Sequence, residues 1–335
     1  MTTLPNLRID AHVHILGDGS AGSGCWLKLQ KPYHKLLARI VLRGLGLPGS
    51  ALKSGLDALY IDSLVKMVRE SSIDAAVILA HENVYDENGK LVPNFGSFYT
   101  PNDYVLKLGK LYPDCFIPAV AIHPARPDAM EELERCIESG AAMLKLLPNC
   151  QNVNCSDKRF SKFWERLAAA HMPFLAHTGG ELSVPVFNAK YASPEVLTLP
   201  LECGVNVIAA HCGTPALLWD RNYTETFIQM TKRHPNLYGD NSGMNTPLRS
   251  KHFGRLLSEE ASERIIHGSD LPIPISATWN LLRGSISAGG WREAQATRNL
   301  IERDARIKTA LGFEARSFSR ILGLLPAGVA ERMRE

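Results

Sequence analysis

The fold of this chain is decided by the stretch Arg8-Ile9-Asp10-Ala11-His12-Val13-His14-Ile15, a short apolar run with polar side chains at alternate positions. Alternate side chains of a β-strand share one face, so Asp10, His12 and His14 are expected to point the same way. Two imidazoles on one face make half of a metal site. The stretch therefore predicts a buried strand with metal-binding residues near its C-terminal end.

The pattern of an apolar run followed by an amphipathic stretch recurs along the 335 residues. It predicts eight strands, near residues 8–15, 74–80, 115–122, 141–147, 173–178, 205–211, 236–241 and 264–269. Helices are expected near residues 57–71, 102–112, 128–139, 159–171, 193–203, 222–234, 248–260 and 300–323. Strands that alternate with helices are typical of parallel βα units. Eight such units predict an α/β protein that closes into a (β/α)8 TIM barrel.

The length suits one such barrel, so we expect a single domain over residues 1–335. Two connections are long, namely residues 17–55 after the first strand and residues 271–298 after the last. The first contains an expected helix from Pro32 to Leu45. Long loops at this end of the strands usually shape the pocket of a barrel enzyme.

The composition indicates a globular, cytoplasmic enzyme. Met1 to Leu7 carries no cationic stretch followed by an apolar core, and no apolar run approaches membrane-spanning length. The net charge is +3, and we expect neither nucleic acid nor membrane as a partner. The seven cysteines contain no C-x-x-C pair, so reduced and mostly buried thiols are expected.

The first long loop is basic. It has no acidic residue between Gly19 and Leu56, and its predicted helix carries a cation at every fourth position, at Lys31, Lys35, Arg39 and Arg43. Such a stripe favours a small, anionic substrate that it steers to the site. A solvated helix face and an acidic subunit interface in a homo-oligomer are the alternatives.

Further metal-binding residue types lie at other strand ends. His177, His211 and Asp270 each follow an apolar run, where a barrel places its active site. One His-x-His pair is a weak motif that a structural role explains equally well, but the combination of His12 and His14 with these three residues favours a borderline metal such as zinc. His267 differs from Asp270 by three positions, so we expect it to point toward the helices.

The role of Lys145 on the fourth strand is open. It can bind an anionic substrate group, form a salt bridge, or react with carbon dioxide to give a carbamate that bridges two metal ions. A free ammonium group is no ligand, so Lys145 joins the metal site as a carbamate or not at all.

Three more residues are candidates for contacts around the metal or the substrate. Asp10 could orient an imidazole from one layer deeper, as carboxylates often do for metal-bound histidine. His81 and His123 follow the second and third strands, and each is as well explained by a local hydrogen bond as by a substrate contact.

A glycine-rich loop offers an alternative cofactor site. Residues 17–22, Gly-Asp-Gly-Ser-Ala-Gly, match the dinucleotide-binding pattern after a strand. The residues that follow are a poor helix start, and the acidic residue expected about 20 positions later is missing. A flexible loop is therefore the better interpretation.

The chain resembles the amidohydrolase superfamily, in particular the amidohydrolase-related (amidohydrolase 2) group of metal-dependent hydrolases and decarboxylases. The resemblance rests on D-A-H-V-H, L-K-L-L-P, A-H-T-G-G, A-H-C-G and H-G-S-D-L-P, and it runs from Ile9 to about Leu325. It implies a metal held by His12, His14, His177 and Asp270, with His211 as a second-metal ligand or a catalytic group. The decarboxylases of the group typically have a proline soon after the H-x-H pair, whereas Ile15-Leu16-Gly17 follows here.

These observations predict a metal-dependent hydrolase that acts on an amide, lactone or ester. We expect one zinc ion, or two if Lys145 is carboxylated. A metal-activated water would attack, Asp270 would carry its proton to the leaving group, and His211 would stabilise the oxyanion. A metal-dependent decarboxylase of a small unsaturated or aromatic carboxylate is the second hypothesis, and a non-catalytic ligand-binding barrel is the third.

Overall fold

Eight parallel strands form the centre of the molecule in the computed structural model, which describes residues 7–29 and 32–333. The strands follow the order β1 (Ile9–His14), β3 (Ala75–Leu79), β5 (Phe116–Val120), β6 (Met143–Leu146), β7 (Phe174–His177), β8 (Val207–Ala210), β9 (Leu237–Asp240) and β10 (Ile265–Ile266). The backbone of β1 accepts and donates hydrogen bonds across to the segment after β10, with Ala11 N donating to His267 O at 3.0 Å. The sheet thereby closes into the predicted (β/α)8 barrel.

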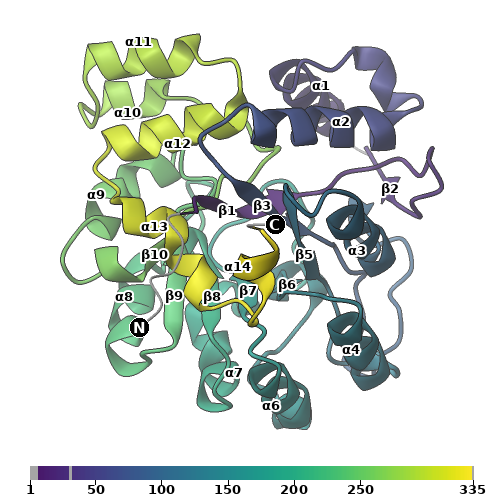
Figure 1. Ribbon diagram of the computed structural model, residues 1–335. Coiled ribbons are helices and arrows are strands. Elements are labelled where there is room, and N and C mark those ends of the chain that lie inside the picture. Colours follow the sequence, from purple (N-terminus) through teal and green to yellow (C-terminus); the bar gives the residue numbers. More distant parts are fainter. Residues whose placement is uncertain (1–6, 30–31, 334–335) are drawn as a thin grey trace.

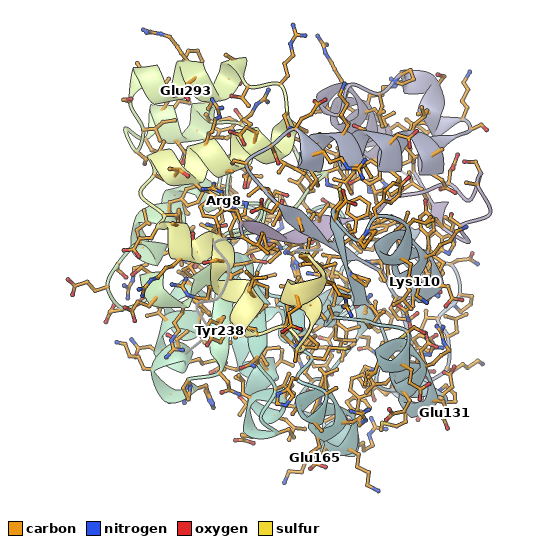
Figure 2. All side chains as sticks on the ribbon, viewed as in Figure 1. Arg8, Lys110, Glu131, Glu165, Tyr238 and Glu293 are labelled. Carbon is orange, nitrogen blue, oxygen red and sulfur yellow. The ribbon has the colours of Figure 1, made fainter. Side chains whose placement is uncertain are left out.

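Helices surround the strands, as Figure 1 shows. Those that follow strands are α2 (Leu56–Arg69), α3 (Asn102–Leu111), α4 (Ala129–Glu138), α5 (Pro148–Gln151), α6 (Ser161–Ala169), α7 (Thr198–Glu202), α8 (Thr224–Arg233), α9 (Phe253–Leu256) and α12 (Leu300–Ala310). The chain ends with α13 (Ala315–Ser319) and α14 (Val329–Arg332). Charged side chains such as Lys110, Glu131 and Glu165 are exposed on the outer helices (Figure 2). No helix in the described part of the chain is long and apolar enough to cross a membrane.

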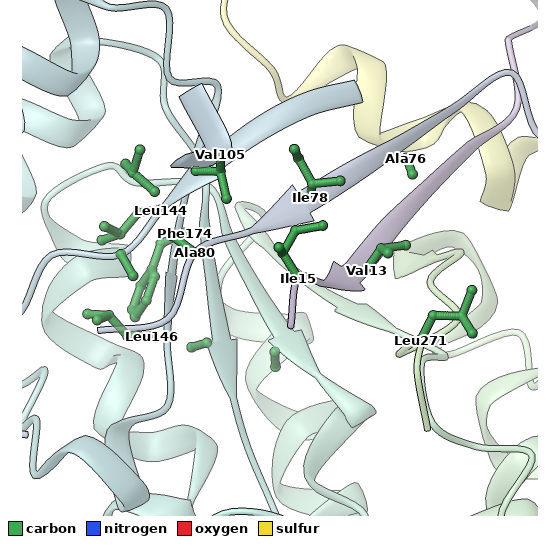
Figure 3. Packing of buried hydrophobic residues seen from close by; sticks show 14 of the residues in the cluster. Val13, Ile15, Ala76, Ile78, Ala80, Val105, Leu144, Leu146, Phe174 and Leu271 are labelled. Carbon is green, nitrogen blue, oxygen red and sulfur yellow. The ribbon is translucent and has the colours of Figure 1, made fainter. Parts of the chain in front are cut away.

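The strands bury both faces, as expected for a barrel enclosed by helices. Ile78, Leu144 and Phe174 belong to the cluster that packs against the helices, part of which Figure 3 shows. Their neighbours Leu79, Met143 and Leu175 belong to a second cluster, which residues between α13 and α14 and Val329 of α14 also join. Consecutive residues therefore alternate between the two layers. The seven cysteines are unpaired, as predicted.

The first strand departs from regular alternation. Asp10 pairs with Ala76 and Val13 pairs with Ile78, so the register shifts between Asp10 and Val13. Partners in adjacent strands share a face, which places Asp10 with Val13 and Ala76 on the helix side. The expectation that Asp10 shares a face with His12 and His14 is therefore wrong. A regular period of two cannot anticipate an irregularity inside a six-residue strand.

The two long loops carry their own secondary structure. The loop after β1 contains α1 (Pro32–Gly44), as predicted, and a two-residue strand β2 (Trp26–Leu27), which pairs antiparallel with β4 (Phe98–Tyr99). The loop after β10 contains α10 (Thr278–Leu282) and α11 (Ala288–Ala296). In the glycine-rich segment of the first loop, the backbone N–H groups of Asp18, Gly19 and Ala21 donate hydrogen bonds to the Asp57 carboxylate.

Candidate metal centre and active-site cavity

Three predicted ligands meet at the C-terminal ends of β1 and β10. His12 Nε2 lies 3.2 Å from His14 Nε2, and Asp270 Oδ1 lies 3.4 Å from each of these nitrogens. Ligands bound about 2.0–2.1 Å from a tetrahedral zinc ion are roughly 3.3 Å from one another. The spacing of the three atoms therefore matches that of zinc ligands.

The backbone around this cluster is strained. Asp270 has a φ of 67° and His211 has a φ of 60°, in the left-handed region that non-glycine residues seldom adopt. Such strain is concentrated at functional sites. Gly268 allows the segment before Asp270 to approach β1, because a Cβ at Gly268 would lie 2.8 Å from the Cβ of His12. The sequence H-G-S-D-L-P thus places a carboxylate against the His-x-His pair.

A carboxylate that the sequence analysis did not single out fixes the tautomer of His12. Asp240, at the end of β9, lies 2.8 Å from His12 Nδ1 through Oδ2. A carboxylate can only accept here, so Nδ1 carries the proton and Nε2 presents a lone pair to the cluster. Asp240 takes the role that we had expected of Asp10, whose Oδ1 accepts instead from the backbone N–H groups of His12 and Ser269.

His211 is held in a similar way. Its Nδ1 lies 2.8 Å from the backbone oxygen of Ser242, which can only accept, so Nδ1 carries the proton and Nε2 is bare. Burial lowers the pKa of His211 well below the ordinary histidine value. In this state His211 can bind a metal or accept a proton, and it cannot donate to an oxyanion. We therefore revise its expected role from oxyanion donor to ligand or proton acceptor.

His177, at the end of β7, joins the same cluster. Its ring centroid lies 4.9 Å from that of His211, and its Nε2 is buried without a hydrogen-bond partner in the described residues. Glu181 Oε2 is 3.6 Å from this nitrogen. A buried imidazole nitrogen without a partner is a fitting metal ligand.

The histidines have the charge state that a metal needs. Burial lowers the pKa of His12 and His177 well below the ordinary value and that of His14 to about 3, so all three are neutral at pH 7. One set of donor atoms from His12, His211 and Asp270 lies within 4.8 Å of one another. Neutral imidazoles and a carboxylate are the donors that zinc prefers, so the residues present fit a divalent metal.

Lys145 reaches the cluster from β6. Its Nζ lies 3.3 Å from His12 Nε2, and the side chain is buried. Burial lowers its pKa to about 8, although Asp240 and Asp270 pull the value upward. The geometry thus brings Lys145 beside the predicted ligands.

His81 and His123, the two further candidate histidines, differ in what their rings contact. His81 is buried and stacks on Phe98, with ring centroids 4.0 Å apart, and burial lowers its pKa. Both ring nitrogens of His123 form hydrogen bonds with the backbone. Nε2 lies 2.9 Å from Gln151 O, and Nδ1 accepts from the N–H of Ala125 at 3.1 Å. Local hydrogen bonding, one of the two interpretations we considered for His123, is therefore what the structure shows.

His267 faces away from the cluster, as its strand parity predicted. Its ring packs against Phe318 of α13, with centroids 4.3 Å apart. It is fully buried among the helices, and burial lowers its pKa.

A cavity of about 530 Å³ opens above the cluster and is lined by His14, His177, His211 and Asp270. Its remaining wall is mostly apolar and comes largely from the two long loops. Trp279 of α10 and Phe98 of β4 are part of this wall. The cavity size is in the usual range for a small-molecule site.

Helix α1 presents an apolar side to the cavity and a basic side to solvent. Leu37 and Val41 line the cavity. The exposed residues include three members of the predicted basic stripe, Lys35, Arg39 and Arg43, while the fourth, Lys31, and the terminal residues 1–6 lie outside the described residues. Steering of an anionic substrate by this stripe stays a prediction.

Four residues at the site were not found from the sequence: Glu181, Asp240, Ser242 and Arg249. Asp240 had a usable signal, because it is a charged residue at a strand end like the predicted ligands. Glu181 and Ser242 lie in loops, where no periodicity indicates a direction. Arg249 begins a short helical turn inside the stretch 248–260, for which the sequence predicts a longer helix.

Replacing Asp240 with asparagine should weaken metal binding by roughly 10- to 100-fold, the usual effect of losing a carboxylate behind a metal-bound histidine. An amide can donate to His12 Nδ1 and stabilise the wrong tautomer. Zinc affinity, measured by competition with a chelator, tests this. Ser242→Ala is the matched control, because it removes the Oγ contact 3.0 Å from His12 Nδ1 and leaves the carboxylate. Equal losses in both variants would contradict the assigned role of Asp240.

Comparisons with known proteins agree with the geometry. A family model described as amidohydrolase matches residues 9–283. No curated protein matches the chain. An uncharacterised TIM-barrel protein from Bordetella bronchiseptica has 18% identity and a TM-score of 0.59, covering 95% of this chain and 98% of that one.

Two other solved structures share the fold at low identity. 5-Carboxyvanillate decarboxylase from Sphingomonas paucimobilis has 10% identity and a TM-score of 0.53, covering 98% of this chain and 99% of that one. 4-Oxalomesaconate hydratase from Rhodopseudomonas palustris has 16% identity and a TM-score of 0.50, with 95% and 97% covered. The family match spans most of the chain and includes His12, His14, Lys145, His177, His211 and Asp270. The chain therefore belongs to the amidohydrolase family.

Proposed function

We propose that this protein is a metal-dependent hydrolase that acts on an amide, lactone or ester of a small, anionic substrate. The observation that carries the proposal is the meeting of Asp270 with His12 and His14 at zinc-ligand spacing. This cluster lies at the base of a cavity with a largely apolar wall. An enclosed site of this kind strengthens electrostatic interactions with a reacting group.

The ion would be held by His12, His14, His177 and Asp270, with His211 close enough to take part. A zinc-type ion bound there would supply a water of lowered pKa and would polarise a carbonyl oxygen. Asp240 and Ser242 hold His12 and His211 so that the bare Nε2 atoms are left for the candidate metal site.

Asp270 is the group that we assign to proton transfer. Burial raises its pKa to about 7, while Arg249 and Lys145 pull it downward. A carboxylate at this position can take a proton from the attacking water and return it to the leaving group. His211 offers a second acceptor at Nε2.

Decarboxylation is the second candidate. Two buried cations, Lys145 and Arg249, adjoin the cluster, and both suit a substrate whose reacting group is itself a carboxylate. The solved decarboxylase and hydratase are only 10% and 16% identical to this chain, so they support the fold and do not favour either reaction.

Hydrolysis and decarboxylation can be distinguished by whether an oxygen atom from water enters the product. Zinc- or manganese-loaded protein should convert a member of a panel of carboxylate-bearing esters, lactones and amides in ¹⁸O-labelled water, with one label entering the acid product. Mass spectrometry of the product and a carbon dioxide assay on a matched panel of aryl carboxylates are the readouts. Carbon dioxide release without label incorporation would replace hydrolysis with decarboxylation.

A further inference from the structure

Arg249 is a buried cation in the wall of the cavity that neither the metal cluster nor the proposed proton transfer uses. It begins the short helical turn Arg249–His252 in the loop after β9, and its side chain is 6% exposed. It lines the cavity together with Asp270, His177 and Glu181. A guanidinium group so deeply buried needs partners, because an unsatisfied charged donor is costly.

One half of the guanidinium fork is already held. Nη2 donates to the backbone oxygen of Gly180 at 2.6 Å. Gly180 is itself fixed, since its N–H donates to Thr214 O at 3.1 Å and a Cβ at this position would meet Asp220 Oδ2. The loop after β7 therefore fixes the position of Arg249 before any ligand binds.

The other half of the fork is free. Nη1 is buried and has no hydrogen-bond partner in the described part of the chain. Burial lowers the pKa of Arg249, while Asp270, Glu181, Asp240 and Asp220 pull it upward. An arginine side chain stays protonated in proteins. An arginine N–H donates a short, charge-assisted hydrogen bond to a carboxylate, and such a bond is roughly twice as strong as a neutral one.

We propose that Arg249 binds a carboxylate group of the substrate, while the apolar wall formed by α1 and α10 holds the hydrocarbon body of the same molecule. The inference rests on the proposed function for the identity of the reacting site and adds the residue that selects the substrate. Arg249 is then a specificity-determining residue, which places the substrate relative to Asp270. The exposed cations of α1 are not needed for this recognition.

Binding of a matched pair of probes tests the proposal without requiring turnover. The probes are 2-naphthoate and its uncharged amide, 2-naphthamide, which share a shape and differ in the carboxylate. Zinc-loaded wild-type protein, Arg249→Met and Arg249→Lys are compared at equal metal content by calorimetric titration. Arg255→Met is the control, because Arg255 forms ion pairs with Glu225 and Glu260 on the outer surface.

Naphthoate affinity should fall by roughly 10- to 100-fold in Arg249→Met, the loss expected for charge-assisted hydrogen bonds. Arg249→Lys should lose less, because it keeps the charge and lacks the fork. Naphthamide affinity should stay unchanged in both variants, and Arg255→Met should bind both probes like the wild type. Unchanged naphthoate affinity in Arg249→Lys and Arg249→Met, or an equal loss for both probes, would overturn the proposal.

Failure of the proposed function would look different. A protein that releases carbon dioxide, or that hydrolyses no member of the panel, still supports the Arg249 inference if naphthoate binding depends on Arg249. A protein that hydrolyses esters while Arg249→Lys and Arg249→Met bind naphthoate normally refutes the inference and leaves the function standing. If Arg249→Met does not fold, Arg249→Lys alone decides the result.

Discussion

Replacing His12 with alanine should remove the metal and lower kcat/KM by about 10³ or more, because the change deletes the imidazole around which the cluster is built. His12 Nε2 has three neighbours within 3.4 Å: His14 Nε2, Asp270 Oδ1 and Lys145 Nζ. Elemental analysis of protein produced with ample zinc or manganese measures the loss, and turnover is measured on the substrate that the labelled-water panel identifies.

His267→Ala is the matched control for this prediction. Both residues are fully buried histidines close to the same junction of β1 and β10, but the His267 ring packs on Phe318. Truncating it should reduce stability through the cavity that it leaves, while one equivalent of metal stays bound. Loss of metal in His267→Ala together with retention in His12→Ala would show that the strand faces are assigned wrongly.

The side chains at the strand ends were predictable from the sequence, because the C-terminal ends of all strands lie at the same face of a barrel. An apolar run that ends in a histidine or an aspartate places that side chain at one rim of the barrel, whichever strand it belongs to. His177, His211 and Asp270 were found in this way, and the structure brings them to the same cavity as His14.

Contacts between distant segments were not predictable by the same reasoning. Asp240 binds His12 across 228 positions of sequence, and no local pattern links the two. The helix expected over residues 248–260 is divided into the turn Arg249–His252 and α9, so a period of 3.6 does not place Arg249 at the cavity. The paired strands β2 and β4 have two residues each, too few for an alternating pattern.

Asp10 shows that a correctly predicted strand can still lead to a wrong prediction of which side chains share a face. The alternation of Asp10, His12 and His14 is perfect in the sequence, yet the register shift moves Asp10 to the helix side. There its pKa is raised to about 7 by burial, and its electrostatic neighbours are Asp304 and Lys308 of α12. A carboxylate that looked like part of the metal site thus belongs to the packing between β1 and α12.

Lys145→Ala should keep one equivalent of metal and lower turnover by roughly 10²-fold, the usual scale for loss of a positioned electrostatic group. We expect one ion, with donor atoms that include those of His12, His211 and Asp270, which lie within 4.8 Å of one another. A bridging carbamate would instead require His177 and His211 to hold a second ion. The alanine variant removes the cationic amine that lies 3.3 Å from His12 Nε2.

The metal count distinguishes these two arrangements directly. A fall from two equivalents to one in Lys145→Ala, restored by short-chain carboxylic acids that can substitute for a carbamate, would establish the two-ion site. A constant single equivalent supports the amine as a cation beside the reacting group. In that case Lys145→Arg should recover part of the lost turnover without any change in metal content, because it keeps a positive charge near Asp270 although its shape differs.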